Sequence, residues 1–263
     1  MNIHTLTSPI VTQPDPAESM IDLAAIEKRF GKLHVLKGVN LHIDRGRVTA
    51  IVGPNASGKT TLIKSILGLT KPDGGQILFD GDKVNGDCQY RERIGYMPQA
   101  ARFPENLSAR EVLAMLKDLR GNPTDIDEEL LDTFAVEDEL DKPLRTLSGG
   151  TRQKISAIVA FLFRPDVIIL DEPTAGLDPV SSGILKDKIS KERDAGRTFI
   201  LTSHIMSEIE ELADDLAFLL DGQIRFAGSV DTLKRQTGAH RLERAIAHMM
   251  VQDDANEESK EAA

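Results

Sequence analysis

An apolar stretch that runs into a glycine-rich loop and a Lys-Thr pair constrains this chain more than any other feature. Residues 47–52 read RVTAIV, residues 53–60 read GPNASGKT, and an amphipathic stretch follows at residues 60–69. This is the pattern G-x-x-x-x-G-K-[ST] between an expected strand and an expected helix. The alternative is a glycine-rich turn followed by Lys and Thr through chance, and the flanking strand and helix argue against it. The loop therefore predicts a nucleotide phosphate site.

The residue types of this loop follow from the chemistry of phosphate. Small residues let backbone N–H groups converge on phosphate oxygens, and the start of a helix adds partial positive charge. Lys59 would meet the β- and γ-phosphates, and the Thr60 hydroxyl would ligate Mg²⁺. We expect nucleotide contacts from the loop and the first helical turn, namely Gly53, Pro54, Asn55, Ala56, Ser57, Gly58, Lys59, Thr60 and Thr61.

A second half of such a site lies at VIILDE, where four apolar residues precede Asp171 and Glu172. In α/β sheets, ligands bind at the carboxyl ends of parallel strands, and Asp171 stands at such an end. Asp171 would hold Mg²⁺, and Glu172 would orient and deprotonate the attacking water. A polar strand end before Pro173 is the alternative, but the phosphate loop in the same chain favours the site.

The remaining pattern indicates an α/β fold. The apolar runs at 167–170, 198–202 and 216–220 are typical of parallel strands covered on both faces. Helical patterns separate them, for instance at residues 184–196, and this alternation favours a mainly parallel sheet. Residues 102–164 have helical character and little strand character, which predicts a helical subdomain inserted between sheet strands.

Composition narrows the function classes. The formal net charge is −10 and no run of Lys and Arg occurs, which argues against a sequence-independent nucleic-acid binder. Cys88 is the single cysteine, so no internal disulfide can form, as fits a reducing compartment. No apolar run approaches the roughly 18 residues of a membrane span. Residues 1–20 are expected to form a disordered leader, and the tail from Val251 is acidic and expected to be disordered.

The stretch LSGG at residues 147–150 opens a helical pattern. A hydroxyl and free N–H groups at a helix start make a second anion site, although a plain N-cap is a fair alternative. In combination, the motifs resemble the ATP-binding subunit of an ABC transporter over residues 21–232. The order of motifs is that of the family: phosphate loop, Gln99, LSGG, Asp171-Glu172, Asp178 and His204.

The resemblance implies a P-loop NTPase (RecA-like) α/β core, an N-terminal antiparallel β subdomain and an inserted helical subdomain. Residues 233–263 would form a C-terminal helical extension and the acidic tail. ATP and Mg²⁺ are the implied cofactors. In this family two ATP-binding domains face each other head to tail. The chain carries one set of motifs, so the second would come from another copy or a homologue.

The resemblance also assigns roles to single residues. Phe30 resembles the aromatic residue that stacks on adenine, with a core Phe as the alternative, and Gln99 the residue that senses Mg²⁺ and the attacking water. His204 resembles the histidine that contacts the γ-phosphate. Asp178 resembles the residue that links the two nucleotide sites. Across the dimer, the γ-phosphate site would be completed by the signature residues Ser148, Gly149 and Gly150.

Two positions depart from the family pattern. Ala56 stands where glycine is usual; if the position needs φ > 0, alanine costs on the order of 1 kcal/mol, and otherwise it costs little. Thr151 replaces the glutamine that commonly ends the signature. Since the set Lys59, Thr60, Gln99, Asp171, Glu172 and His204 is complete, the resemblance implies an active ATPase.

The implied partners are transmembrane permease subunits that dock near the Gln99 loop and the helical subdomain, with the chain peripheral on the cytoplasmic face of the membrane. The stretches FPENLSAREVLAML and LSGGTRQK resemble ATPases paired with ABC-2 type export permeases, some of which serve copper-enzyme maturation. Two alternatives stay open. A soluble ABC-type ATPase acting on DNA or ribosomes would carry long insertions or tandem domains. A small-molecule kinase would leave LSGG and His204 unexplained.

Overall fold

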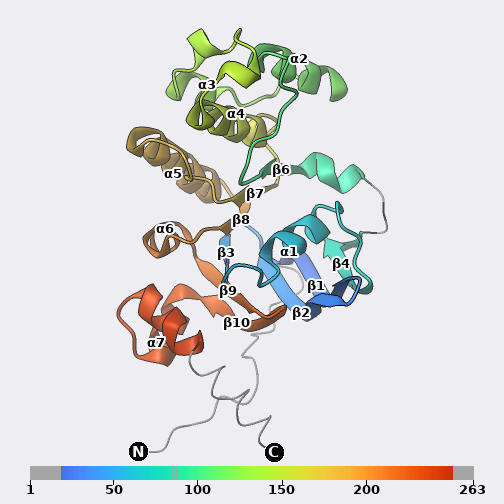
Figure 1. The fold of residues 1–263 in the computed structure, drawn as a ribbon, viewed down its shortest axis with the longest axis vertical. Helices are drawn as coiled ribbons and strands as arrows, with labels where there is room; N and C mark the ends of the chain where they lie inside the picture. The colour runs from blue at the N-terminus through green and yellow to red at the C-terminus, as the bar shows by residue number, and fades with distance from the viewer. Residues whose placement is uncertain (1–18, 85, 87, 251–263) are drawn as a thin grey trace, which may run out of the picture. The chain divides into compact units, whose positions relative to one another are not determined.

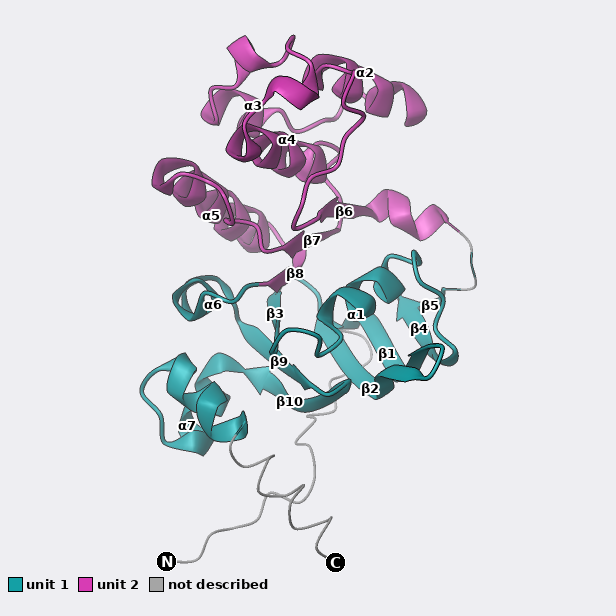
Figure 2. Ribbon diagram, in the orientation of Figure 1, with its two compact units in different colours: residues 1–86, 203–263 teal, residues 87–202 magenta. Residues whose placement is uncertain are grey.

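The computed structural model describes residues 19–84, 86 and 88–250 (Figure 1). Most of the expected leader and all of the acidic tail from Val251 lie outside these residues. The chain forms two compact units (Figure 2). The first unit comprises residues 1–86 and 203–263, and the second unit comprises residues 87–202.

The first unit contains an antiparallel sheet in the strand order β2-β1-β4-β5. Its strands are β1 (Ser19–Phe30), β2 (Leu33–Asp44), β4 (Gly74–Phe79) and β5 (Asp82–Lys83). A tight turn joins β1 and β2, and it is possible because Gly31 adopts φ +60°. The N-terminal antiparallel β subdomain is thereby confirmed. Its first strand begins at Ser19, two residues inside the expected leader.

The first unit also contains β3 (Val48–Val52), which pairs in parallel with β9 (Asp215–Leu220), and β10 (Gln223–Ser229), which is antiparallel to β9. All five residues of β3 are buried, as expected for a strand covered on both faces. The helices are α1 (Lys59–Ile66), α6 (Met206–Leu212) and α7 (Val230–Thr237), and residues 242–250 are helical too.

Helix α1 ends at Ile66, within the amphipathic stretch of residues 60–69 and close to Gly68. Gly68 adopts φ +64°, and the N–H groups of Leu69 and Thr70 both donate to the Lys64 carbonyl at 2.8 and 3.0 Å. A left-handed glycine that redirects the chain in this way satisfies the last carbonyls and stops the helix.

The second unit holds the parallel strands β6 (Ile94–Met97), β7 (Val167–Asp171) and β8 (Thr198–Thr202) in the order β8-β7-β6. Every residue of β7 and β8 is buried. The helices are α2 (Ala109–Leu119), α3 (Glu129–Thr133), α4 (Gly149–Phe161) and α5 (Pro179–Asp194). Parallel strands in both units confirm the expected mainly parallel α/β core. Residues 102–164 contain helices and no strand.

Helix α5 begins five residues before the start that its sequence pattern predicts. The Asp178 carboxylate accepts the Ser181 N–H at 3.0 Å, and Pro179 occupies the first helical position. Both features favour a helix start, since the carboxylate satisfies a free N–H and proline lacks one. Similarly, α2 begins with a capping box formed by Ser108 and Glu111.

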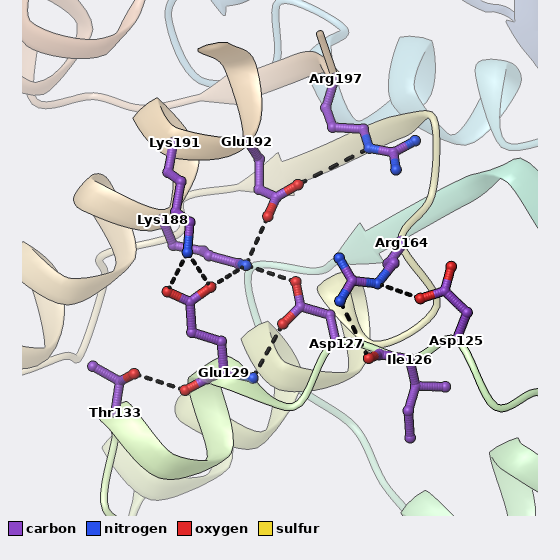
Figure 3. A network of polar contacts seen from close by, with 10 residues as sticks. All are labelled: Asp125, Ile126, Asp127, Glu129, Thr133, Arg164, Lys188, Lys191, Glu192 and Arg197. Atoms are coloured by element: carbon purple, nitrogen blue, oxygen red, sulfur yellow. Dashed lines mark hydrogen bonds and ion pairs between the residues drawn. The ribbon is translucent and has the colours of Figure 1, made fainter. Parts of the chain in front are cut away.

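A buried charge network joins α5 to the helical segment of the second unit, residues 102–164 (Figure 3). The ammonium group of Lys188, whose side chain is 3% exposed, donates to Asp127 at 2.6 Å, Glu129 at 2.8 Å and Glu192 at 2.7 Å. Burial alone lowers the pKa of Lys188, but the three hydrogen bonds to carboxylates outweigh it and raise that pKa above its ordinary value. The residue is therefore a fixed cation.

Further cations balance the network. Lys191 donates to both oxygens of Glu129, and Arg197 lies 4.0 Å from Glu192, so three carboxylates meet three cations. Hydrogen bonds from Lys188 and Lys191 lower the pKa of Glu129 to about 2. The three carboxylates lie close enough to hold a metal ion, but Lys188, Lys191 and Arg197 already balance their charge.

We expect Lys188→Met to destabilise the protein by about 3–5 kcal/mol, because removal of one partner from a buried ion pair leaves carboxylates uncompensated. Lys191→Met is the matched control. Its side chain is 63% exposed, and a surface ion pair contributes about 1 kcal/mol or less. Urea unfolding of the two variants measures both values. An equal decrease in the free energy of unfolding in the two variants would show that burial of Lys188 does not make its ion pairs more important for stability.

Candidate functional site

The phosphate loop begins directly after the buried strand β3 and ends as α1 begins at Lys59. Its backbone turns through Asn55 and Ala56, and the Ser57 N–H donates to the Pro54 carbonyl at 3.2 Å. The last residue before the helix, Gly58, has φ +111°, a conformation that L side chains rarely adopt. The loop thus delivers the helix N-terminus, with its partial positive charge, to one place.

The first glycine of the loop is required by close backbone contact. A Cβ on Gly53 would lie 2.0 Å from the Leu219 carbonyl oxygen at the end of β9, and one on Gly58 would lie 2.9 Å from the Leu36 side chain. The Gly222 N–H, in the turn between β9 and β10, donates to the Ser57 carbonyl at 3.1 Å. The loop is therefore fixed from outside by β2 and by the β9–β10 turn.

The loop offers polar groups that suit an anion. The Ser57 side chain is 3% exposed, and among the described residues its buried hydroxyl has no hydrogen-bond partner. Lys59 folds over the loop and donates to the carbonyls of Gly53 and Pro54 at 2.7 and 3.0 Å. Thr60 is exposed on the first turn of α1, with Thr61 half-buried beside it. A buried hydroxyl without a partner costs free energy, so this cradle fits a phosphate that would satisfy it.

Ala56 adopts φ 65°, which resolves the two alternatives for this position. The position lies in the left-handed region that favours glycine, so alanine is held there against its own preference. Glu172, directly after β7, likewise has a positive φ of 52°. Both conformations are of the kind that costs about 1–3 kcal/mol and persists where the surrounding structure imposes it.

Phe30 ends β1 and is 53% exposed. The Lys28 ammonium lies 5.3 Å from the centroid of its ring. Exposure excludes the alternative of a core phenylalanine and leaves a ring on which a flat heterocycle can stack.

Asp171 is the last residue of β7 and is 7% exposed. Its neighbour across the sheet is Thr202, the last residue of β8, which is fully buried. The Thr202 hydroxyl donates to Asp171 Oδ1 at 2.5 Å. The next residue, Glu172, donates its backbone N–H to the Thr202 carbonyl at 3.1 Å and to the Thr202 hydroxyl oxygen at 3.2 Å. Two adjacent carboxylates thus stand at this strand end, as predicted.

Gln99 lies two residues beyond β6 and is exposed. Tyr96 lies in β6. Burial raises the pKa of its phenol to about 12, and the negative charge of Asp171 adds to this shift. The phenol is therefore protonated at neutral pH. The parallel pairing of Met97 with Leu170 carries the chain of Gln99 past the end of β7.

The signature residues occupy the start of α4. The Ser148 hydroxyl accepts the Thr151 N–H at 3.0 Å and lies 2.7 Å from the Thr151 hydroxyl. Ser148 is thus the N-cap, and the threonine that departs from the family pattern adds a second contact to it. Gly149 is exposed, and a Cβ on Gly150 would lie 2.9 Å from the Gly176 carbonyl oxygen.

Asp178 lies close to the same helix start. Hydrogen bonds from the Ser181 hydroxyl and N–H hold the pKa of its carboxyl well below the usual range, and Lys154 of α4 approaches it at 3.4 Å. The signature and the loop before α5 are thereby joined within the second unit. His204 is exposed in the turn after β8. Ser203 holds this turn by accepting the Ile205 N–H at 3.0 Å and donating to Glu208 at 3.1 Å.

Two residues that support the site are not evident from the motifs. Thr202 bonds both Asp171 and the backbone of Glu172, and its only sequence signal is a polar residue at the end of the apolar run TFILT. Gly222 holds the phosphate loop through its N–H and packs against β2, where its own Cβ would lie 2.3 Å from the Val35 carbonyl oxygen. Its signal is the Asp-Gly turn between β9 and β10.

Known proteins are similar to this chain in sequence and in fold. The family model described as ABC transporter matches residues 36–175. The daunorubicin resistance ATP-binding protein DrrA3 of Streptomyces coeruleorubidus is 34% identical over 232 residues, which are 86% of this chain and 73% of that protein. The Nod factor export ATP-binding protein I of Ralstonia nicotianae is 31% identical, with 78% of this chain and 65% of that protein covered.

The phospholipid-transporting ATPase ABCA3 of Homo sapiens is 32% identical over 95% of this chain, but the chain spans only 15% of that protein. Among solved structures, one described as the ATP binding subunit of an ABC transporter is 28% identical, with a TM-score of 0.83 over 88% of this chain and all of that one. A dimeric bacterial ABC transporter cassette is 25% identical over 80% of this chain and 98% of that one, with a TM-score of 0.71.

We expect Ala56→Gly to raise the free energy of unfolding by about 1 kcal/mol, because glycine relieves the left-handed backbone. Nucleotide affinity should change by less than about tenfold, or ~1.4 kcal/mol. Thermal unfolding and ATP titration measure the two effects. Ala135→Gly is the matched control: Ala135 has φ 50° and is exposed outside the loop, so it should gain similar stability with unchanged affinity. A lower free energy of unfolding in Ala56→Gly would show that the backbone at Ala56 is not strained.

Proposed function

The chain belongs to the ABC transporter family as an ATP-binding, ATP-hydrolysing subunit, and on that premise we propose that it energises export through a separate membrane permease of the ABC-2 type. The observation that carries the proposal is the likeness to DrrA3 over 86% of the chain, together with the phosphate cradle around Ser57. DrrA3 is named for drug resistance, and the Ralstonia protein for export of Nod factors.

In the proposed site, the residues of the phosphate loop bind ATP. Backbone N–H groups of Gly53 and of residues 55–61, with the ammonium of Lys59, would hold the phosphate oxygens, while the exposed ring of Phe30 would stack on adenine. His204 would donate to the γ-phosphate from its turn after β8. These assignments follow the motifs, and the buried hydroxyl of Ser57 is consistent with a phosphate in the loop.

The residues present also fit Mg²⁺. The candidate donors are the Asp171 carboxylate, the Thr60 hydroxyl and the Gln99 amide oxygen, all hard oxygen groups of the kind that Mg²⁺ prefers. Asp171 is fixed at its Oδ1 by Thr202, which prepares one orientation of the carboxylate. When bound with ATP, Mg²⁺ would neutralise charge on the phosphates.

Glu172 is the proposed general base. It follows the metal-binding aspartate directly, and its strained backbone at φ 52° is fixed by two acceptors on Thr202. The carboxylate would accept the proton of the attacking water, a contribution of about 10²–10⁴-fold in rate.

We propose that the working form is a dimer. The chain carries one phosphate loop and one signature, and the related cassette of known structure is dimeric. Ser148, Gly149 and Gly150 of one copy would complete the γ-phosphate site of the other, with Asp178 linking the two sites. ATP then holds the dimer closed, and its hydrolysis releases the contact.

A membrane partner completes the proposal. Among the residues that the structure describes, no helix is long and apolar enough to cross a bilayer. By analogy with the export relatives, a permease would supply the path, and the cytoplasmic face of the membrane is the proposed location. Neither the site nor the relatives point to copper-enzyme maturation, so we do not propose that role.

We expect Glu172→Gln to retain ATP binding, to lose about 10²–10⁴-fold in turnover and to accumulate as an ATP-bound dimer, because the amide cannot accept the proton. Steady-state ATPase rates and size-exclusion chromatography with ATP measure these effects. Glu243→Gln is the control, since Glu243 is exposed on the helix of residues 242–250 and should keep wild-type turnover. Turnover of Glu172→Gln at the wild-type rate would show that another group is the base.

We expect tagged Glu172→Gln, with ATP and Mg²⁺, to capture a polytopic membrane protein in stoichiometric amount from detergent-solubilised membranes of its host. Mass spectrometry identifies the partner, and its sequence would show the permease type. The phosphate-loop variant Lys59→Ala is the control and should capture less. Recovery of ribosomal or DNA-associated proteins alone would contradict export and favour a soluble ABC-type ATPase.

A further inference from the structure

We propose that Thr202 is a positioning residue for hydrolysis, which fixes the metal-binding carboxylate of Asp171 through its hydroxyl and the backbone of Glu172 through both of its oxygens. The inference rests on the proposed roles of Asp171 and Glu172 and adds the residue that holds them together. It deepens the proposed function by naming a group outside the nucleotide motifs on which the magnesium site depends.

The contacts single out the hydroxyl of Thr202. This side chain is fully buried at the last position of β8, directly opposite Asp171 in the parallel pairing with β7. Its O–H donates to Asp171 Oδ1 at 2.5 Å, a short distance of the kind that charge-assisted hydrogen bonds show. Asp171 is itself only 7% exposed, so water does little to hold this carboxylate in place.

The same residue holds the neighbouring backbone. The Glu172 N–H is shared between the Thr202 carbonyl at 3.1 Å and the Thr202 hydroxyl oxygen at 3.2 Å. Since the hydroxyl donates its hydrogen to Asp171, its oxygen is available to accept from Glu172. One O–H group is thus donor to one carboxylate residue and acceptor for the next.

This geometry has a consequence for magnesium. A carboxylate that ligates a metal binds best when a second group fixes its orientation, and loss of such an outer partner typically costs about 10–100-fold in metal affinity or activity. With Oδ1 directed by Thr202, the carboxylate cannot rotate freely about its side chain. The backbone contact meanwhile supports the strained φ of 52° at Glu172.

The test is the magnesium dependence of nucleotide binding, measured by calorimetry with a non-hydrolysable ATP analogue. In Thr202→Val, which keeps the shape and strand preference but lacks the hydroxyl, we expect the half-saturating Mg²⁺ concentration to rise about 10–100-fold. Affinity in EDTA should be unchanged. Thr202→Ser, which keeps the hydroxyl, should restore the wild-type magnesium dependence, and Thr202→Ala replaces the valine variant if that one does not fold.

Thr198→Val is the matched control. Thr198 lies in the same strand and on the same face, is 2% exposed, and stands at the opposite end of β8 from Asp171. It should keep the wild-type magnesium dependence. An equal shift in Thr198→Val would show that loss of any buried hydroxyl in β8 has the effect, and would overturn the inference.

Asp171→Asn separates the two levels of the proposal. If Asp171→Asn loses magnesium-dependent binding and Thr202→Val does not, the positioning role of Thr202 is wrong and the proposed site stands. If Asp171→Asn binds with wild-type magnesium dependence, the metal role of Asp171 is wrong, and the inference fails with it.

Discussion

The contact between the Gly53 backbone and the Leu219 carbonyl, where a single added carbon would lie 2.0 Å from oxygen, determines how the first unit can be built. It requires β9 to end against the start of the phosphate loop, and the Gly222 N–H then holds the loop at Ser57. The loop follows β3 directly and leads into α1. The cradle is consequently a product of sheet packing.

Backbone strain occurs in both of the motifs that carry the proposed chemistry. Ala56 and Glu172 have positive φ, and neither is a glycine. At Glu172 the neighbouring strand supplies two acceptors for the N–H, whereas Ala56 sits in an exposed turn of the loop. The strain at Glu172 accompanies a side chain with a proposed catalytic role. The strain at Ala56 has no such role and would be removed by glycine.

Much of this could be predicted from the sequence, and the reasons are physical. Strand β8 was predicted residue for residue, and β3, β7 and β9 to within a residue at either end, because buried parallel strands are short continuous apolar runs. The start of α5 was wrong by five residues, since capping by Asp178 outweighs the polar character of the first turn. The phosphate loop and the acidic strand end carry local motifs. Thr202 and Gly222 each carry a weak local signal, but they act through contacts with distant segments that this signal does not identify.

The network around Lys188 limits how this protein can change. Asp127 and Glu129 belong to the helical segment, whereas Lys188 and Glu192 belong to α5, so the Lys188 ammonium compensates carboxylates of both segments. A single exchange leaves a buried charge without its counterpart, while joint replacement by apolar residues of similar volume can be neutral or stabilising. Stepwise replacement of the ionic network by apolar residues therefore passes through less stable single variants. The attachment of α5 to the helical segment therefore requires these residues to change together.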